Sequence, residues 1–217
     1  MKLFVLVAGL LLGQGLALAV DGPTVTFSKF FKGSTPEYVN ITVDKAGGVI
    51  YKEAPDDERP VQFSLQPAET AEIFALADKL NHFSRPLESP AKVANMGMKT
   101  LRYENAPAKT EVKFNYTEDA DARSLTDWFE RVIETEQGYF NLERSVKFDK
   151  LGVNLALLQV QLTLERKRLI APQQFLPLLD RVAKNESFMH MSRERAASLA
   201  EYFRKTPAGQ GDKKSEQ

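Results

Sequence analysis

Two pairs of methionine residues are the most unusual candidates for chemistry in this sequence of 217 residues. Once a predicted signal segment at the N-terminus is set aside, every methionine lies in a Met-x-Met pair. Thioether and imidazole groups suit Cu(I), and a copper site built from them needs no cysteine. One hypothesis is therefore a copper site made of Met96, Met98, Met189, His190 and Met191. The competing interpretation is core filling by flexible side chains, and residues i and i+2 of a helix point to different faces, which weakens chelation near position 190.

Aromatic residues in predicted strands form a second set of candidates. Tyrosine combines a large contact area with a polar tip, and it is enriched in protein interfaces. Phe30 and Phe31 are adjacent, so one of them faces away from the core side of a regular strand. The candidate binding residues are Phe30, Tyr38, Tyr51, Tyr103 and Tyr116. In the alternative interpretation, helices from the second half of the chain cover these rings.

Recognised catalytic motifs do not occur in the sequence. There is no Gly-x-Ser-x-Gly elbow, phosphate-binding glycine loop, dinucleotide fingerprint or His-Glu-x-x-His motif, and there are only two histidines. Carboxylates are abundant, but a glycosidase-type hydrolase needs two of them facing each other across a cleft, which a sequence does not reveal. We therefore predict no catalytic residue and, apart from the copper alternative, no cofactor. A carboxylate hydrolase stays open as a second class.

Composition narrows the classes further. Lys and Arg together number 29, as do Asp and Glu, so no overall charge favours nucleic acid as a partner. The complete lack of cysteine excludes disulfide scaffolds, cysteine-based zinc sites and iron–sulfur clusters. Hydrophobic residues make up 43% of the chain and charged residues 27%, which is typical of a globular protein.

The N-terminus predicts export. Lys2 precedes an apolar run from Leu3 to Leu12, and Ala17-Leu18-Ala19 fits the small-x-small rule for signal cleavage. The run is shorter than the ~20 apolar residues that a membrane-spanning helix needs. We therefore expect residues 1–19 to be a signal peptide, and the mature chain to be periplasmic or secreted with no integral membrane association.

Hydrophobic and polar residues mainly alternate with period two over residues 20–117, which favours strands. The glycines of Asp44–Gly48 predict a hairpin turn, and Val61-Gln62-Phe63 is typical of a short strand. A helix is predicted over 69–80, followed by a second hairpin with its turn at 104–109. We summarise this half as a βββ–α–ββ layout.

The period changes to 3.6 over residues 118–205, which predicts helices. Thr117 is the expected N-cap of the first of them, and Gly138 the expected break or kink before the next. Residues 151–164 fit both a helix and a strand, and their length favours the helix. The tail 206–217 has no large apolar residue, so we expect it to be disordered.

These patterns together predict an α+β fold, in which a small antiparallel sheet is followed by a helical C-terminal half that packs on it. The two halves are expected to form one domain, with two domains as the alternative. The layout is similar to that of small exported sheet-and-helix binding modules, without any shared motif. We therefore predict a non-enzymatic exported module that binds a protein or a cell-envelope component. A carboxylate hydrolase and a copper-binding protein are the alternatives.

Overall fold

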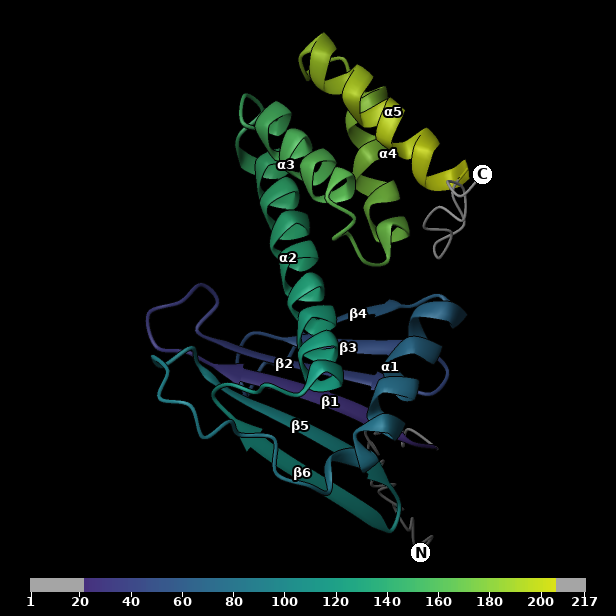
Figure 1. The fold of residues 1–217 in the computed structure, drawn as a ribbon. Helices are drawn as coiled ribbons and strands as arrows, with labels where there is room; N and C mark the ends of the chain where they lie inside the picture. Colours follow the sequence, from purple (N-terminus) through teal and green to yellow (C-terminus); the bar gives the residue numbers. More distant parts are fainter. Residues whose placement is uncertain (1–21, 206–217) are drawn as a thin grey trace, which may run out of the picture.

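The computed structural model describes residues 22–205 and has an α+β fold, an antiparallel sheet followed by a helical C-terminal half (Figure 1). This confirms the predicted fold class. The predicted signal peptide, residues 1–19, and the predicted disordered tail, residues 206–217, lie outside the described residues.

The sheet has six strands in the order β4-β3-β2-β1-β5-β6, and every neighbouring pair is antiparallel. The short strand predicted at residues 61–63 is confirmed as β4, which pairs with β3, so the summary βββ–α–ββ counted one strand too few before the first helix. Both predicted hairpins are present, and Gly47 has the positive φ of +92° that the turn between β2 and β3 requires. The strands are β1 Thr24–Phe30, β2 Tyr38–Asp44, β3 Gly48–Lys52, β4 Val61–Ser64, β5 Met98–Asn105 and β6 Ala108–Phe114.

One face of the sheet is covered by α1 (Pro67–Lys79) and by the first half of α2 (Ala120–Phe148) (Figure 1). Alternate strand residues such as Phe27 and Ile41 point to this face and are completely buried. No helix of the described chain lies on the opposite face, where Thr26 and Thr42 share a hydrogen bond of 3.1 Å. The sheet therefore has one apolar, helix-covered face and one polar, open face.

Helix α2 is 29 residues long and runs without interruption through Gly138, so the predicted break is wrong. A single helical glycine is unfavourable by only ~1 kcal/mol. Apolar residues on both sides of Gly138 have cores to pack into, Ile133 in the first and Leu142 in the second. The predicted cap is also corrected: Asp119, not Thr117, is the N-cap, and its carboxylate accepts the N–H of Ala122 at 2.9 Å.

The second half of α2 and the three later α-helices form a separate hydrophobic core at the end of α2 remote from the sheet (Figure 1). We call residues 139–205 the helical lobe and residues 24–133 the sheet lobe. The ambiguous stretch 151–164 is helical. In the helical C-terminal half, the first half of α2 packs on the sheet. The later helices pack mainly on the second half of α2 and on one another. The remaining elements are η1 Asn81–Phe83, α3 Val153–Glu165, η2 Pro172–Phe175, α4 Leu176–Lys184 and α5 His190–Lys205.

Candidate functional site

The two methionine pairs lie in different lobes. Met96 and Met98 precede and begin β5, at one end of the sheet, whereas the second pair lies at the start of α5 in the helical lobe (Figure 1). His190 forms an ion pair with Glu194 at 3.2 Å. The five candidate copper ligands therefore do not converge on one site. Within residues 22–205 the structure also contains no group of three or more His, Asp or Glu side chains arranged to hold a metal ion.

The five candidate aromatic residues are divided between the two faces of the sheet. Tyr51 is fully buried under Phe140 of α2, and its hydroxyl donates to Glu53 at 2.8 Å. Tyr103 points to the same covered face and stacks on His82. Tyr51 is thus covered by a helix of the second half, as the alternative interpretation expected, whereas Tyr103 is covered by His82 of η1, in the first half of the chain.

The other three candidates are more accessible but do not gather into one patch. Phe30 is 53% exposed and lies opposite Tyr38 in the β1–β2 register, on the open face. Tyr116 follows β6 and lines a small pocket between the sheet and α2. The proposed tyrosine surface is therefore reduced to one exposed phenylalanine with a half-buried tyrosine beside it.

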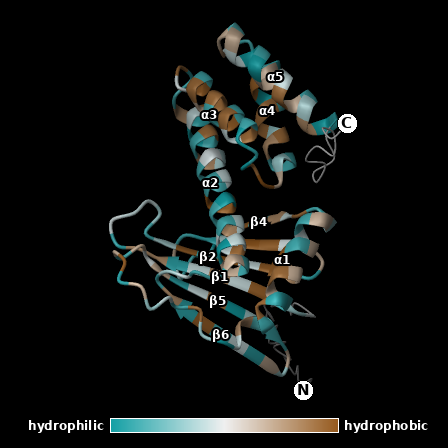
Figure 2. Cartoon of the chain, viewed as in Figure 1, coloured by the Kyte–Doolittle hydropathy of each residue, from teal (hydrophilic) through white to brown (hydrophobic). Residues whose placement is uncertain are grey.

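An exposed apolar face lies instead on the helical lobe, and sequence reasoning missed it. Leu151, Leu155 and Leu162 are 77%, 60% and 38% exposed, although α3 buries Leu157 and Val160 on its other side. Figure 2 shows hydrophobic residues along most of α3. Phe148, at the end of α2, is 82% exposed as well. The signal was present in the sequence, because α3 has leucines in excess of those that one buried stripe can use.

A groove of about 650 Å³ lies beside this face, between α3 and α5. Its apolar lining comes from Leu164 and Leu199, together with Met191 and Tyr202. Its polar lining carries both signs of charge, from Glu165, Lys167, Glu194 and Arg195. We call the exposed leucines of α3 together with this groove the helical-lobe face. Such a surface is suited to binding an amphipathic segment rather than to proton transfer.

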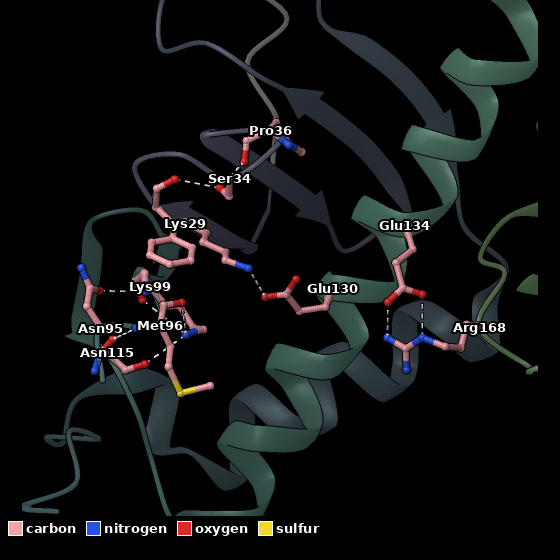
Figure 3. Close-up of polar contacts among 12 residues, drawn as sticks. Lys29, Ser34, Pro36, Asn95, Met96, Lys99, Asn115, Glu130, Glu134 and Arg168 are labelled. Atoms are coloured by element: carbon pink, nitrogen blue, oxygen red, sulfur yellow. Dashed lines mark hydrogen bonds and ion pairs between the residues drawn. The ribbon is translucent and has the colours of Figure 1, made fainter. Parts of the chain in front are cut away.

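A second cavity, of about 280 Å³, lies between the start of β5 and α2 and is lined by the buried Lys99 (Figure 3). This ammonium donates to the carbonyl oxygens of Met96, Gly97 and Asn115, at 3.4, 3.3 and 3.0 Å. Burial lowers the pKa of Lys99, and the positive charge of Lys29 lowers it further. All three ammonium protons are engaged, so Lys99 ties two loops together rather than presenting a free nucleophile.

Other side chains hold the same corner of the molecule together. The Asn115 side chain accepts the N–H of Met96 at 2.7 Å and donates to the carbonyl of Ala94 at 3.0 Å. Lys29 of β1 forms an ion pair of 2.8 Å with Glu130 of α2 (Figure 3). These contacts fix the end of the sheet against α2, which is a structural role.

The carboxyl group with the most perturbed environment is Glu136 of α2. Burial raises its pKa to about 7, partly opposed by a hydrogen bond from Gln174 and reinforced by the charge of Glu53. A raised pKa is one property of a general acid. However, Glu136 is completely buried and lines neither the groove nor the Lys99 cavity. The pairing of carboxylates across an open cleft that a hydrolase needs is not seen at this residue.

Among the described residues, no helix is both long and apolar enough to cross a membrane. The chain matches no protein-family model, and it matches no curated protein. The functional assignment therefore depends on the geometry of the helical-lobe face and of the buried polar groups.

Proposed function

We propose that this chain is an exported, non-enzymatic binding protein that recruits a partner protein through its helical-lobe face. The observation that carries the proposal is the exposure of Leu155 and Leu162 on a single side of α3, together with that of Leu151 in the turn before it. Export follows from the predicted signal segment at residues 1–19.

Exposed leucines in a row are unfavourable for a protein that works alone. Single exposed hydrophobic residues are ordinary, but contiguous apolar patches on a folded protein generally mark interaction sites. Further exposed apolar side chains occur in the same lobe, because Phe148 at the end of α2 is 82% exposed and Met191 of the groove is 58% exposed. A partner that covers these side chains removes them from water, which is the main driving force of association.

The spacing of the leucines indicates the kind of partner. Leu151, Leu155, Leu158 and Leu162 are separated by four, three and four residues, the spacing of a coiled-coil seam. The flanking residues Asn154, Gln159 and Gln161 are uncharged, whereas the adjoining groove carries charges of both signs, so the leucines suit the apolar side of a partner and the groove its polar edge. We infer that the occupant is an amphipathic helix of a partner protein, which lies along α3 and the groove.

The test is a cross-linked pull-down with the full chain expressed in its source cells, read by mass spectrometry. The wild type is compared with L155E/L162E, which places two carboxylates in the seam, and with V93E as a matched control. Val93 is 41% exposed but lies near the sheet, so V93E alters an exposed apolar residue outside the helical-lobe face.

The expected result is a reproducible partner that the wild type and V93E capture and that L155E/L162E loses. The captured protein should contain an amphipathic helix whose deletion also abolishes cross-linking. Equal capture by all three chains would overturn the proposed surface. Light scattering of the purified chains is measured in parallel, and a wild-type dimer that L155E/L162E dissociates would identify a second copy as the occupant instead.

A further inference from the structure

A carboxyl group is buried where the two hydrophobic cores meet. Glu136 lies on α2 between Ile133, which belongs to the core of the sheet lobe, and Leu142, which belongs to the core of the helical lobe. Its Oε1 accepts a hydrogen bond of 2.9 Å from the side-chain amide of Gln174. Its Oε2 is buried without any hydrogen-bond partner in the structure. A carboxyl in this position is much easier to accommodate with its proton than without it.

The groups that face Glu136 do not supply a compensating positive charge. Glu53, which follows β3, carries a like charge and accepts hydrogen bonds from Tyr51 at 2.8 Å and Gln137 at 2.5 Å. The hydroxyls of Tyr51 and Tyr139 are the other titratable groups that interact with Glu136, and burial raises the pKa of each, which keeps them neutral. From η2, Gln174 contributes only an amide.

The cation nearest in that segment is already engaged. Arg168 forms two hydrogen bonds with Glu134, at 2.6 and 2.9 Å (Figure 3). It forms a third with Asp127, at 3.0 Å. Its guanidinium therefore pairs with the exposed carboxylates of Glu134 and Asp127 rather than with Glu136.

Residues 168–174, which we call the strap, return from α3 and bind three consecutive side chains of α2. Arg168 binds Glu134, the N–H of Ile170 donates to the hydroxyl of Thr135 at 3.0 Å, and Gln174 binds Glu136. Ile170 and Ala171 are buried in the core of the sheet lobe, although the chain on either side of them belongs to the helical lobe. The strap therefore joins the two lobes across the point where Glu136 is buried.

We propose that Glu136 is a proton-operated latch, which holds the strap closed on α2 when it is protonated and loosens the strap when it ionises. Ionisation places an uncompensated charge in the junction, and water must enter to solvate it. The latch is therefore closed at acidic pH and loosens as pH rises through neutrality. Loosening frees the helical lobe to move relative to the sheet. The latch does not depend on the proposed binding function.

The test is amide hydrogen exchange of the strap in the full chain, for the wild type and for E136Q, at intervals from pH 5.5 to 8.5. Glutamine keeps the shape of the protonated carboxyl and cannot ionise. The ratio of the two exchange rates at each pH cancels the intrinsic pH dependence of exchange. We expect a ratio that already exceeds one at pH 5.5, rises by up to about tenfold per pH unit, and levels off above neutrality.

A matched control is E134Q, which weakens the exposed pair with Arg168 on the same helix. Because Glu134 is exposed, E134Q should raise strap exchange by a similar factor at pH 5.5 and at pH 8.5. A wild-type to E136Q ratio that stays constant across the pH range would overturn the proposal.

A measurement on the wild type alone guards against a variant that fails to fold. The side-chain carboxyl carbon of Glu136 is followed by NMR during a pH titration. A midpoint near 7, together with loss of strap amide signals over the same range, supports the latch. A midpoint near 4.5, the ordinary value for glutamate, overturns it.

Discussion

Phe27 of β1 stacks on Phe129 of α2, with ring centroids 5.0 Å apart and planes only 5° from parallel. Both rings are completely buried, and the Trp128 ring packs edge-on against Phe129 at 5.3 Å. This stack lies at the centre of the contact between the sheet and α2. Since α2 also supports the helical lobe, the stack determines where that lobe stands relative to the sheet.

We expect F129A to destabilise the protein by about 3–5 kcal/mol, because it removes a large buried ring and leaves a cavity beneath α2. Urea denaturation followed by Trp128 fluorescence measures the change. F148A is the matched control, since Phe148 lies on the same helix and is 82% exposed. It should change the free energy of unfolding by less than about 0.5 kcal/mol. Similar losses for the two variants would contradict the importance of the stack.

Local patterns in the sequence identified most elements because each strand buries one face. Val39, Ile41 and Val43 alternate with polar residues and are all buried, so period two located β2 correctly. The helix over 153–165 was similarly predictable from its length and repeat. These inferences need only the neighbours of a residue along the chain.

Inferences about sites failed where they depended on how distant elements pack. The continuation of α2 beyond Ile133 carries its C-terminal end, where α3 begins, roughly 20 Å further from the sheet at a rise of ~1.5 Å per residue. The two methionine pairs therefore lie in different lobes, because α2 is continuous where the sequence predicted a break at Gly138. Tyr51 and Phe30 have similar local sequence patterns, but their side chains point to opposite faces of the sheet. Tyr51 points toward α2 and is buried, whereas Phe30 points to the open face and is exposed. The sequence did contain a sign that Glu136 is buried. This carboxylate lies four residues after Val132, so it falls on the apolar stripe of α2.

The continuity of α2 leads to a prediction about Gly138. This residue is helical, and a Cβ added to it would meet no heavy atom within 4 Å. G138A should therefore stabilise the protein by up to about 1 kcal/mol, because alanine loses less backbone entropy on folding. Thermal unfolding checks this. A loss of stability would indicate that α2 needs to bend at this position.

The N-cap of α2 should contribute measurably. D119A removes the acceptor of the Ala122 N–H and the partner of Arg85, and should destabilise the protein by about 1–2 kcal/mol at pH 7. Arg85 and the Ala122 N–H hold the pKa of Asp119 below its usual value, so this contribution is present at neutral pH and is lost as the carboxylate is protonated in acid. Urea denaturation at pH 7 and pH 3 should show a smaller difference at pH 3. D121A, which removes no cap, should have little effect at either pH.

The ammonium of Lys99 should be structural rather than catalytic. K99M keeps the length of the side chain but leaves the carbonyls of Met96, Gly97 and Asn115 without their donor, so we expect a loss of about 2–3 kcal/mol. K92M, at an exposed lysine of the same segment, is the control and should be neutral. If K99M were as stable as the wild type, the amine would be free for another role, and the adjacent cavity would need to be screened for ligands.

The pH dependence of global stability provides an independent test of the Glu136 environment. The pKa of this carboxyl is raised from 4.5 in the unfolded chain to about 7 in the folded protein, so the folded state binds the extra proton between these values. Stability contributed by that proton is present at low pH and is lost as pH rises from about 4.5 to 7, a change of at most about 3 kcal/mol.

E136Q cannot lose this proton, so its free energy of unfolding relative to the wild type should increase over the same range and become constant above neutral pH. Urea denaturation at pH 5, 6, 7 and 8 measures the difference, in which the titration of other groups largely cancels. Parallel pH profiles for the two chains would mean that Glu136 ionises normally, and that water already reaches the junction in the folded protein.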